Sequence, residues 1–135
     1  MEQTLLIIKP DAVNRDLIGE ILKRVEKDGF RIEELKMLRV TPEEGSRFYQ
    51  VHKGKPFYQE LVDYISSGRI VVTHLKREKA VEKLRELIGA TDPRKAEKGT
   101  IRADFGLDIC HNSVHASDSN ENAKIEIDFF FGKKS

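Results

Sequence analysis

Thr4-Leu5-Leu6-Ile7-Ile8 is a continuous apolar run that ends abruptly at Lys9-Pro10. A strand with one face in water alternates apolar and polar residues, whereas a strand covered on both faces is apolar throughout. The run therefore predicts a central strand, buried on both faces, around which the other elements are arranged.

The next segments alternate between helical and extended patterns. Residues 17–25 carry apolar side chains at helical spacing and stop at Asp28-Gly29, and residues 30–40 are rich in strand-forming side chains. Thr41-Pro42-Glu43-Glu44 combines a cap residue, a proline at the first helical position and a glutamate at the third. This helix should run to Tyr49 or Gln50.

The second half of the chain continues this alternation. A helix should open at Pro56, a strand should cover residues 70–75, and residues 80–88 should form a helix that ends at Gly89. Periodicity then disappears from residue 89 to residue 105, which predicts a long functional loop. A helix after Asp118 and a last strand near residues 127–131 complete the order.

This order predicts an α+β fold, a ferredoxin-like sandwich with a βαββαβ core and an antiparallel sheet. A helical hairpin is inserted in its middle, and the long functional loop lies before the last helix. The chain has 135 residues, an ordinary size for one domain, so residues 1–135 should form a single domain.

Composition limits the classes of partner. The chain has 24 Lys+Arg and 23 Asp+Glu, a net charge of +1, so no global field draws it to nucleic acid or to an anionic membrane. Its one cysteine, Cys110, excludes an internal disulfide and fits a reducing compartment. The amino terminus lacks a signal-peptide pattern, and no apolar run reaches the roughly 20 residues of a membrane span. We expect a cytoplasmic protein.

The most informative polar stretch is Asn112-Ser113-Val114-His115-Ala116-Ser117-Asp118-Ser119. Asp118 and Glu121 have the spacing of a capping box, so the positive end of a helix should face His115 and attract phosphate. A lone histidine is more often structural than reactive, but these neighbours favour a nucleophile.

The stretch resembles the N-x-x-H-x-S-D-S signature of nucleoside diphosphate kinases, in which the histidine becomes phosphorylated. Further segments resemble the same family in the same order: Lys9-Pro10-Asp11, Tyr49-Gln50-Val51-His52 with Lys55-Pro56-Phe57, Gly89-Ala90-Thr91-Asp92-Pro93 and Gly99-Thr100-Ile101-Arg102. The resemblance covers nearly the whole chain. Three positions depart from the common family pattern, namely Arg69, Lys98 and His111, and none removes a group assigned to chemistry.

The resemblance implies a phosphotransferase. The γ-phosphate of a nucleoside triphosphate, usually ATP, would pass to a nucleoside diphosphate by a ping-pong mechanism through phospho-His115. Glu126 would hold the histidine N–H, with help from Ser117, and Tyr49 would stand beside the ring. The residues implied to surround the phosphates are Lys9, Arg85, Thr91 and Arg102.

The resemblance also implies how the nucleoside is held. Phe57 and Ile109 would lie on the two faces of the base, and stacking without base-edge hydrogen bonds gives broad base specificity. Asn112, with Lys9, would bind the ribose 3′-hydroxyl. Without the family resemblance, Phe57 could equally be a core residue of a helix, and Glu126 could be a surface charge.

The sequence contains no pair or triad of carboxylates at the spacing of a dedicated metal site. Mg²⁺ is therefore expected to arrive on the nucleotide phosphates with most of its water. A zinc site made by His111, His115 and Asp118 is the alternative, and it is disfavoured because this segment precedes the predicted helix and need not place both rings on one face.

Two other classes of function fit this sequence less well. A nucleotide-binding relative without catalysis should have lost the histidine or the phosphate cradle, and this chain keeps both. An RNA-binding sheet of the same broad fold should carry paired aromatic residues on its strands, which are missing here. The resemblance further implies a homo-oligomer, either a hexamer or a tetramer.

Overall fold

A four-stranded antiparallel sheet with the order β2-β3-β1-β4 organises the computed structural model, which describes residues 1–107 and 112–132. The strands are β1 (Glu2–Ile8), β2 (Arg31–Leu38), β3 (Ile70–Arg77) and β4 (Val114–Ala116). The prediction of a central first strand is confirmed, because β1 lies between β3 and β4.

The helices follow the predicted order through most of the chain. They are α1 (Pro10–Asn14), α2 (Ile18–Lys27), α3 (Pro42–Phe48), α4 (Tyr58–Ile65), α5 (Ala80–Ile88), α6 (Ile101–Phe105) and α7 (Asn120–Phe131), with short 3-10 helices at Gln50–His52 and Pro93–Lys95. Within the two described ranges, none of these helices is both long and apolar enough to cross a membrane.

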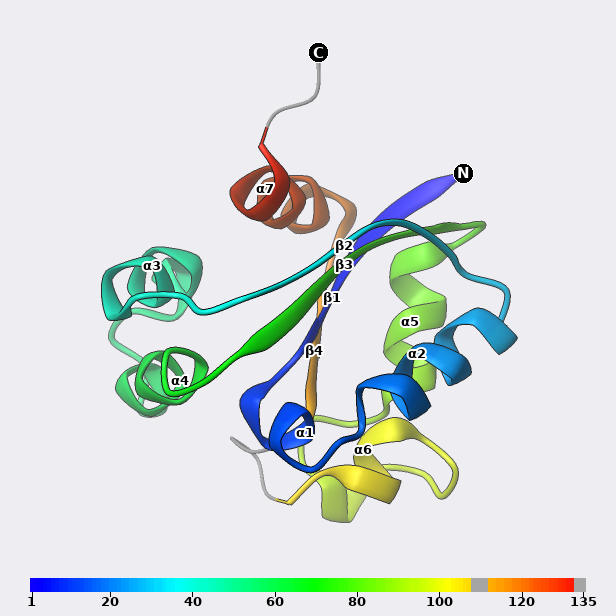
Figure 1. Ribbon diagram of the computed structural model, residues 1–135, viewed down its shortest axis with the longest axis horizontal. Coiled ribbons are helices and arrows are strands. Elements are labelled where there is room, and N and C mark those ends of the chain that lie inside the picture. Colours follow the sequence, from blue (N-terminus) through cyan, green and yellow to red (C-terminus); the bar gives the residue numbers. More distant parts are fainter. Residues whose placement is uncertain (108–111, 133–135) are drawn as a thin grey trace.

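Helices cover both faces of the sheet. In Figure 1, α2 and α5 lie on one side of the strands, and the α3–α4 hairpin and α7 lie on the other. Leu6 and Ile8 of β1 belong to the core on the α2 and α5 side, whereas Leu5 and Ile7 belong to the core on the α4 and α7 side. The alternation of a strand between two faces explains why its apolar run is unbroken.

The sheet order and the helix positions confirm the ferredoxin-like α+β fold. Strand β1 leads through α2 to β2, and β3 leads through α5 to β4, with the α3–α4 hairpin inserted between the two halves. The capping box at Thr41 and Glu44 is present, with each side chain accepting the backbone N–H of the other residue.

The predicted last strand is wrong. Residues 127–131 belong to helix α7, and the fourth strand is instead the three-residue β4 that carries His115. Ala123, Ile127 and Phe130 are the buried residues of α7, and their spacing of four and three is that of one helical stripe. The aromatic residues at 129–131 resemble a strand only when this stripe is overlooked.

Two smaller predictions near the site also need correction. The segment from residue 89 to residue 105 is not structureless, because Thr100 caps the five-residue helix α6 by accepting the N–H of Ala103. Helix α7 is capped by Ser119 rather than by Asp118, since the Ser119 hydroxyl accepts the N–H of Asn122.

Candidate active site

His115 lies at the middle of β4, beside the central strand. It is paired with Ile7 of β1, and its side chain is 20% exposed. Because successive side chains of a strand point to opposite faces, the neighbours Val114 and Ala116 are buried against the sheet core while His115 faces a cleft. The strand thus holds an accessible imidazole on a rigid element.

Glu126 of α7 contacts the histidine ring. Its Oε1 atom lies 2.9 Å from His115 Nε2 and accepts a second hydrogen bond of 2.8 Å from the hydroxyl of Ser117. The Ser117 side chain is fully buried and its Oγ also accepts the N–H of Leu5. Glu126 is thereby fixed by β1 through Ser117 and can fix the imidazole in turn.

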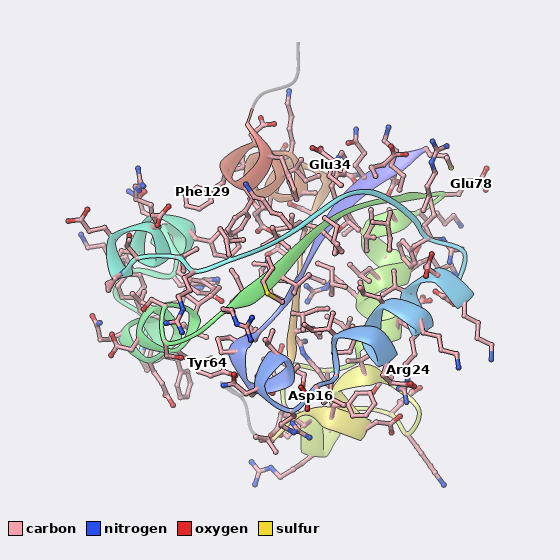
Figure 2. The ribbon with its side chains drawn as sticks, viewed as in Figure 1. Asp16, Arg24, Glu34, Tyr64, Glu78 and Phe129 are labelled. Carbon is pink, nitrogen blue, oxygen red and sulfur yellow. The ribbon has the colours of Figure 1, made fainter. Side chains whose placement is uncertain are left out.

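Two aromatic rings flank the imidazole from the α3 side. Phe48 is 5.2 Å from His115, with ring planes at 74°, and Tyr49 is 6.5 Å away at 86°. Both are edge-to-face contacts. Tyr49 was predicted at this place, whereas Phe48 was not singled out, because an aromatic residue at a helix end reads as core. In Figure 2, Phe129 of α7 lies toward α3, and its ring is 5.7 Å from that of Phe48.

Lys9 and Asn112 meet at the end of β1. The Lys9 ammonium donates to Asn112 Oδ1 at 3.0 Å, and both side chains are almost completely buried. Asn112 Nδ2 donates to the carbonyl oxygen of Thr91 at 3.1 Å. Three separate segments are therefore joined at one side of the cleft.

Arg102 is a buried cation with an unusual set of partners. Its Nη1 and Nη2 atoms donate to the carbonyl oxygens of Gly89 and Val114 at 3.1 and 3.0 Å, and its Nε is buried without a hydrogen-bond partner. Burial, and then the charge of Arg85, lowers the pKa of Arg102 to about 10. The guanidinium consequently stays charged at neutral pH, close to a second cation, a setting that suits an anionic ligand.

The predicted residues line one cleft of about 340 Å³. Those on its wall are Lys9, Tyr49, Phe57, Arg85, Thr91, Arg102, Asn112, His115 and Glu126. Ile109, the remaining predicted contact, lies outside the described residues, as does His111. The structure thus brings together every predicted site residue that it describes.

The cleft also contains residues that sequence reasoning did not assign. They are Phe48, His52, Leu61, Ala116, Asp118, Asn122 and Ile125. Burial, followed by the charges of Lys55 and His115, lowers the pKa of His52. The hydrogen bond from Asn122 is the main cause that lowers the pKa of Asp118. His52 had a signal in the sequence as part of the 49–52 segment, and Ala116 and Asp118 as part of the stretch that carries His115.

No metal centre is evident in the described part of the chain. Within it, no group of three or more histidine, cysteine, aspartate or glutamate side chains is arranged to hold an ion. The two carboxylates of the cleft are engaged by protein donors, Glu126 by His115 and Ser117, and Asp118 by Asn122.

Comparisons with known proteins identify a family for this chain. A family model described as nucleoside diphosphate kinase matches residues 2–135. Nucleoside diphosphate kinase 1 of Protochlamydia amoebophila is 54% identical over 130 residues, covering 96% of this chain and 92% of that protein. The nucleoside diphosphate kinase of Chlamydia abortus is 56% identical over 133 residues, covering 98% and 94%.

Solved structures match at the level of the backbone. The Aquifex aeolicus nucleoside diphosphate kinase has a TM-score of 0.94 and 49% identity, covering 96% of this chain and 94% of that one. A halophilic nucleoside diphosphate kinase from Halobacterium salinarum, solved in complex with CDP, has a TM-score of 0.93 and 38% identity, covering 98% and 88%. Sequence and backbone agree, and the chain belongs to the nucleoside diphosphate kinase family.

Proposed function

We propose that this chain is a nucleoside diphosphate kinase that works through phospho-His115. It takes the γ-phosphate from a nucleoside triphosphate, usually ATP, and gives it to a nucleoside diphosphate in a second half-reaction. The observation that carries this proposal is the 2.9 Å contact between His115 Nε2 and the Glu126 carboxylate inside the cleft.

This contact supports a separate role for each ring nitrogen. When Nε2 carries the proton and donates it to Glu126, the lone pair on Nδ1 is free to attack. A bond forms between Nδ1 and the γ-phosphorus, and the bond from that phosphorus to the β–γ bridging oxygen breaks. The nucleoside diphosphate leaves with the bridging oxygen. The ring gains positive character, which the carboxylate of Glu126 stabilises.

The second half-reaction reverses these changes. A terminal phosphate oxygen of another nucleoside diphosphate attacks the phosphorus, and the bond to His115 Nδ1 breaks. Both half-reactions need positive charge and hydrogen-bond donors around the transferring oxygens more than covalent help. We assign this role to Lys9, Arg85, Thr91 and Arg102, which line the same cleft as the histidine.

Phe57 supports the assignment of the base subsite. Its side chain is 50% exposed although it lines the cleft, so the ring presents an apolar face to a ligand instead of filling the core. We assign the ribose hydroxyl to Asn112 and Lys9, which are already hydrogen-bonded to each other. Ile109 remains the proposed contact on the opposite face of the base. Stacking of this kind accepts every base.

Mg²⁺ belongs to the substrate in this proposal. It enters on the nucleotide phosphates and keeps most of its water, because the cleft offers Glu126 and Asp118 only as carboxylates already bound to protein donors.

A homo-oligomer, a hexamer or a tetramer, is also proposed. Light scattering coupled to size exclusion tests it, and a monomer at working concentration contradicts it.

Labelled ATP tests the central step. The protein is incubated with γ-labelled ATP and Mg²⁺, freed from nucleotide, and treated separately with acid and with base. We expect label that is lost in acid and retained in base, as for phosphohistidine, and that passes to added GDP or CDP. Label that survives acid, or that fails to pass to a diphosphate, contradicts the proposal.

A further inference from the structure

Asp11 is a buried carboxylate that touches the histidine segment without lining the cleft. It lies in α1, is 8% exposed, and is absent from the cleft wall. Its Oδ1 accepts the hydroxyl of Tyr64, and its Oδ2 accepts the hydroxyl of Ser113 at 3.1 Å. Figure 2 shows Tyr64 where α4 faces α1. The partly exposed guanidinium of Arg15 also lies 3.6 Å from Asp11 Oδ2 and forms an ion pair with it.

Ser113 has a backbone conformation that its residue type disfavours. Its φ is +74°, and the N–H of Val114 donates to the carbonyl oxygen of Asn112 at 2.9 Å across it. This hydrogen bond and this φ are those of the rarer, strained form of the γ-turn. A Cβ atom makes left-handed backbone costly, so such a residue persists only when its surroundings hold it.

The turn determines how the chain enters the site. On one side of Ser113, Asn112 accepts a hydrogen bond from the Lys9 ammonium. On the other side, Val114 is paired with Ile8 of β1. The Ser113 carbonyl oxygen accepts the N–H of Lys9 at 2.9 Å. A slip of one residue at this point would turn His115 to the opposite face of the sheet, because side chains alternate along a strand.

We infer that Asp11 is a positioning residue for phosphoryl transfer, which holds the strained turn at Ser113. Its two carboxylate oxygens accept one hydroxyl each, so Tyr64 orients the carboxylate and the carboxylate orients Ser113. The turn then keeps Asn112 at Lys9 and His115 in the cleft. The inference rests on the function proposed above, and it assigns to the site a group that never touches the nucleotide.

Glycine distinguishes this role from ordinary packing. A glycine at 113 adopts positive φ without the steric cost, so it needs neither the hydroxyl nor Asp11. The measured quantity is the single-turnover rate of His115 phosphorylation by labelled ATP and Mg²⁺. Asp11→Ala and Ser113→Ala should each slow it by roughly 5- to 30-fold, the factor by which left-handed backbone is disfavoured for residues with a Cβ atom. Ser113→Gly should keep the wild-type rate and should restore it in Asp11→Ala.

Lys79→Gly is the matched control. Lys79 also has a positive φ, +54°, but it is exposed and precedes α5. Glycine there should relieve the cost of positive φ without changing the turn at Ser113. Equal rescue of Asp11→Ala by Lys79→Gly and Ser113→Gly would show a general stability effect and overturn the inference, as would a wild-type rate in Asp11→Ala itself.

Two further comparisons complete the test. If Asp11→Ala does not fold, Ser113→Ala and Ser113→Gly are compared with Asp11 intact, and equal rates in these two variants contradict the inference. Wild-type protein is run in parallel. Absence of acid-labile label on the wild type contradicts the proposed function, whereas normal labelling of the wild type with no effect at residues 11 and 113 contradicts only the role of Asp11.

Discussion

Glu126 and His115 come from different elements, helix α7 and strand β4, and meet through a 2.9 Å contact between Oε1 and Nε2. The same carboxylate oxygen accepts the hydroxyl of Ser117 at 2.8 Å. An acceptor held from two sides fixes both the tautomer and the direction of the imidazole.

Glu126→Gln keeps the shape of the side chain and can still accept through its amide oxygen, but it removes the charge that stabilises the phosphorylated ring. We expect turnover to fall by roughly 10–100-fold, as for partners of metal-bound histidines, with nucleotide affinity little changed. Glu126→Ala should be slower still. Single-turnover labelling measures the effect. If both variants react at the wild-type rate, a different acceptor orients His115.

His115→Ala should abolish transfer and leave nucleotide binding largely intact, because the phosphate cradle and the stacked base provide the affinity. Turnover with ATP and GDP, and titration with ADP, separate the two effects. His74→Ala is a control histidine variant, since His74 lies on β3 and is not part of the cleft wall. Retained turnover in His115→Ala removes the histidine from the mechanism.

Phe57→Ala should weaken binding of ADP, GDP and CDP by similar factors, since a stacking contact worth roughly 1–3 kcal/mol reads no base edge. Isothermal titration with each diphosphate measures it. Leu107→Ala is the matched control, because Leu107 is 59% exposed and does not line the cleft. A loss confined to one base would show edge recognition, and an unchanged affinity would show that Phe57 only packs.

Gly89→Ala should lower both stability and turnover. Gly89 has φ +88°, and a Cβ atom added there would lie 2.5 Å from Thr100 Oγ1. The carbonyl oxygen of Gly89 accepts a hydrogen bond from Arg102 Nη1. Gly99→Ala separates strain from collision, because Gly99 has φ +93° but nothing within 4 Å of an added Cβ. We expect a loss of about 1 kcal/mol of unfolding free energy at Gly99, and a larger loss with slower transfer at Gly89. Equal effects would exclude the collision with Thr100.

The capping box gives a pH-dependent stability. Hydrogen bonds from the backbone and side chain of Thr41 lower the pKa of Glu44 below its ordinary value of 4.5. A lowered folded-state pKa contributes stability above pH 4.5, and this contribution is lost as the pH falls through the lower folded value. Urea unfolding should therefore show that Glu44→Ala is most destabilising above pH 5 and progressively less so in acid.

Glu43→Ala is the control for that series, since it removes a carboxylate from the same helical turn and leaves the Thr41–Glu44 pair intact. The difference between the two variants isolates the capping box from the general effect of charge near a helix start. A difference that does not change between pH 7 and pH 3 would contradict the assignment.

Much of the fold could be predicted because its signals are long or chemically specific. The apolar run of β1, the helical stripe of α2 and the capping box at Thr41 each depend on local chemistry, and each is present as predicted. Strand β4 has only three residues, too few for any periodicity. The sequence therefore predicts the last strand at residues 127–131 instead, because their aromatic side chains favour a sheet.

For the candidate site, the sequence indicates which residues take part more readily than how they are arranged. The family motifs identify Lys9 and His115, and the structure places both in one cleft. The left-handed Ser113 has no signal in the sequence, because serine gives no indication of positive φ. Phe48 was missed because the edge contact of its ring with His115 joins two residues far apart in the chain, which no local pattern contains.

The pairing of Ile7 with His115 has a consequence for how the protein is made. Contacts between the two ends of the chain, such as the one that joins Lys9 and Asn112 across 103 positions, form slowly because a long loop must close first. During synthesis the amino-terminal elements emerge first, and until β4 arrives, one edge of the very apolar β1 presents unpaired backbone groups, a template for aggregation. Docking of β4 therefore pairs Leu6, Ile7 and Ile8 of that edge and brings His115 into the cleft, so the same contact that protects the newly made chain from aggregation also completes the candidate site.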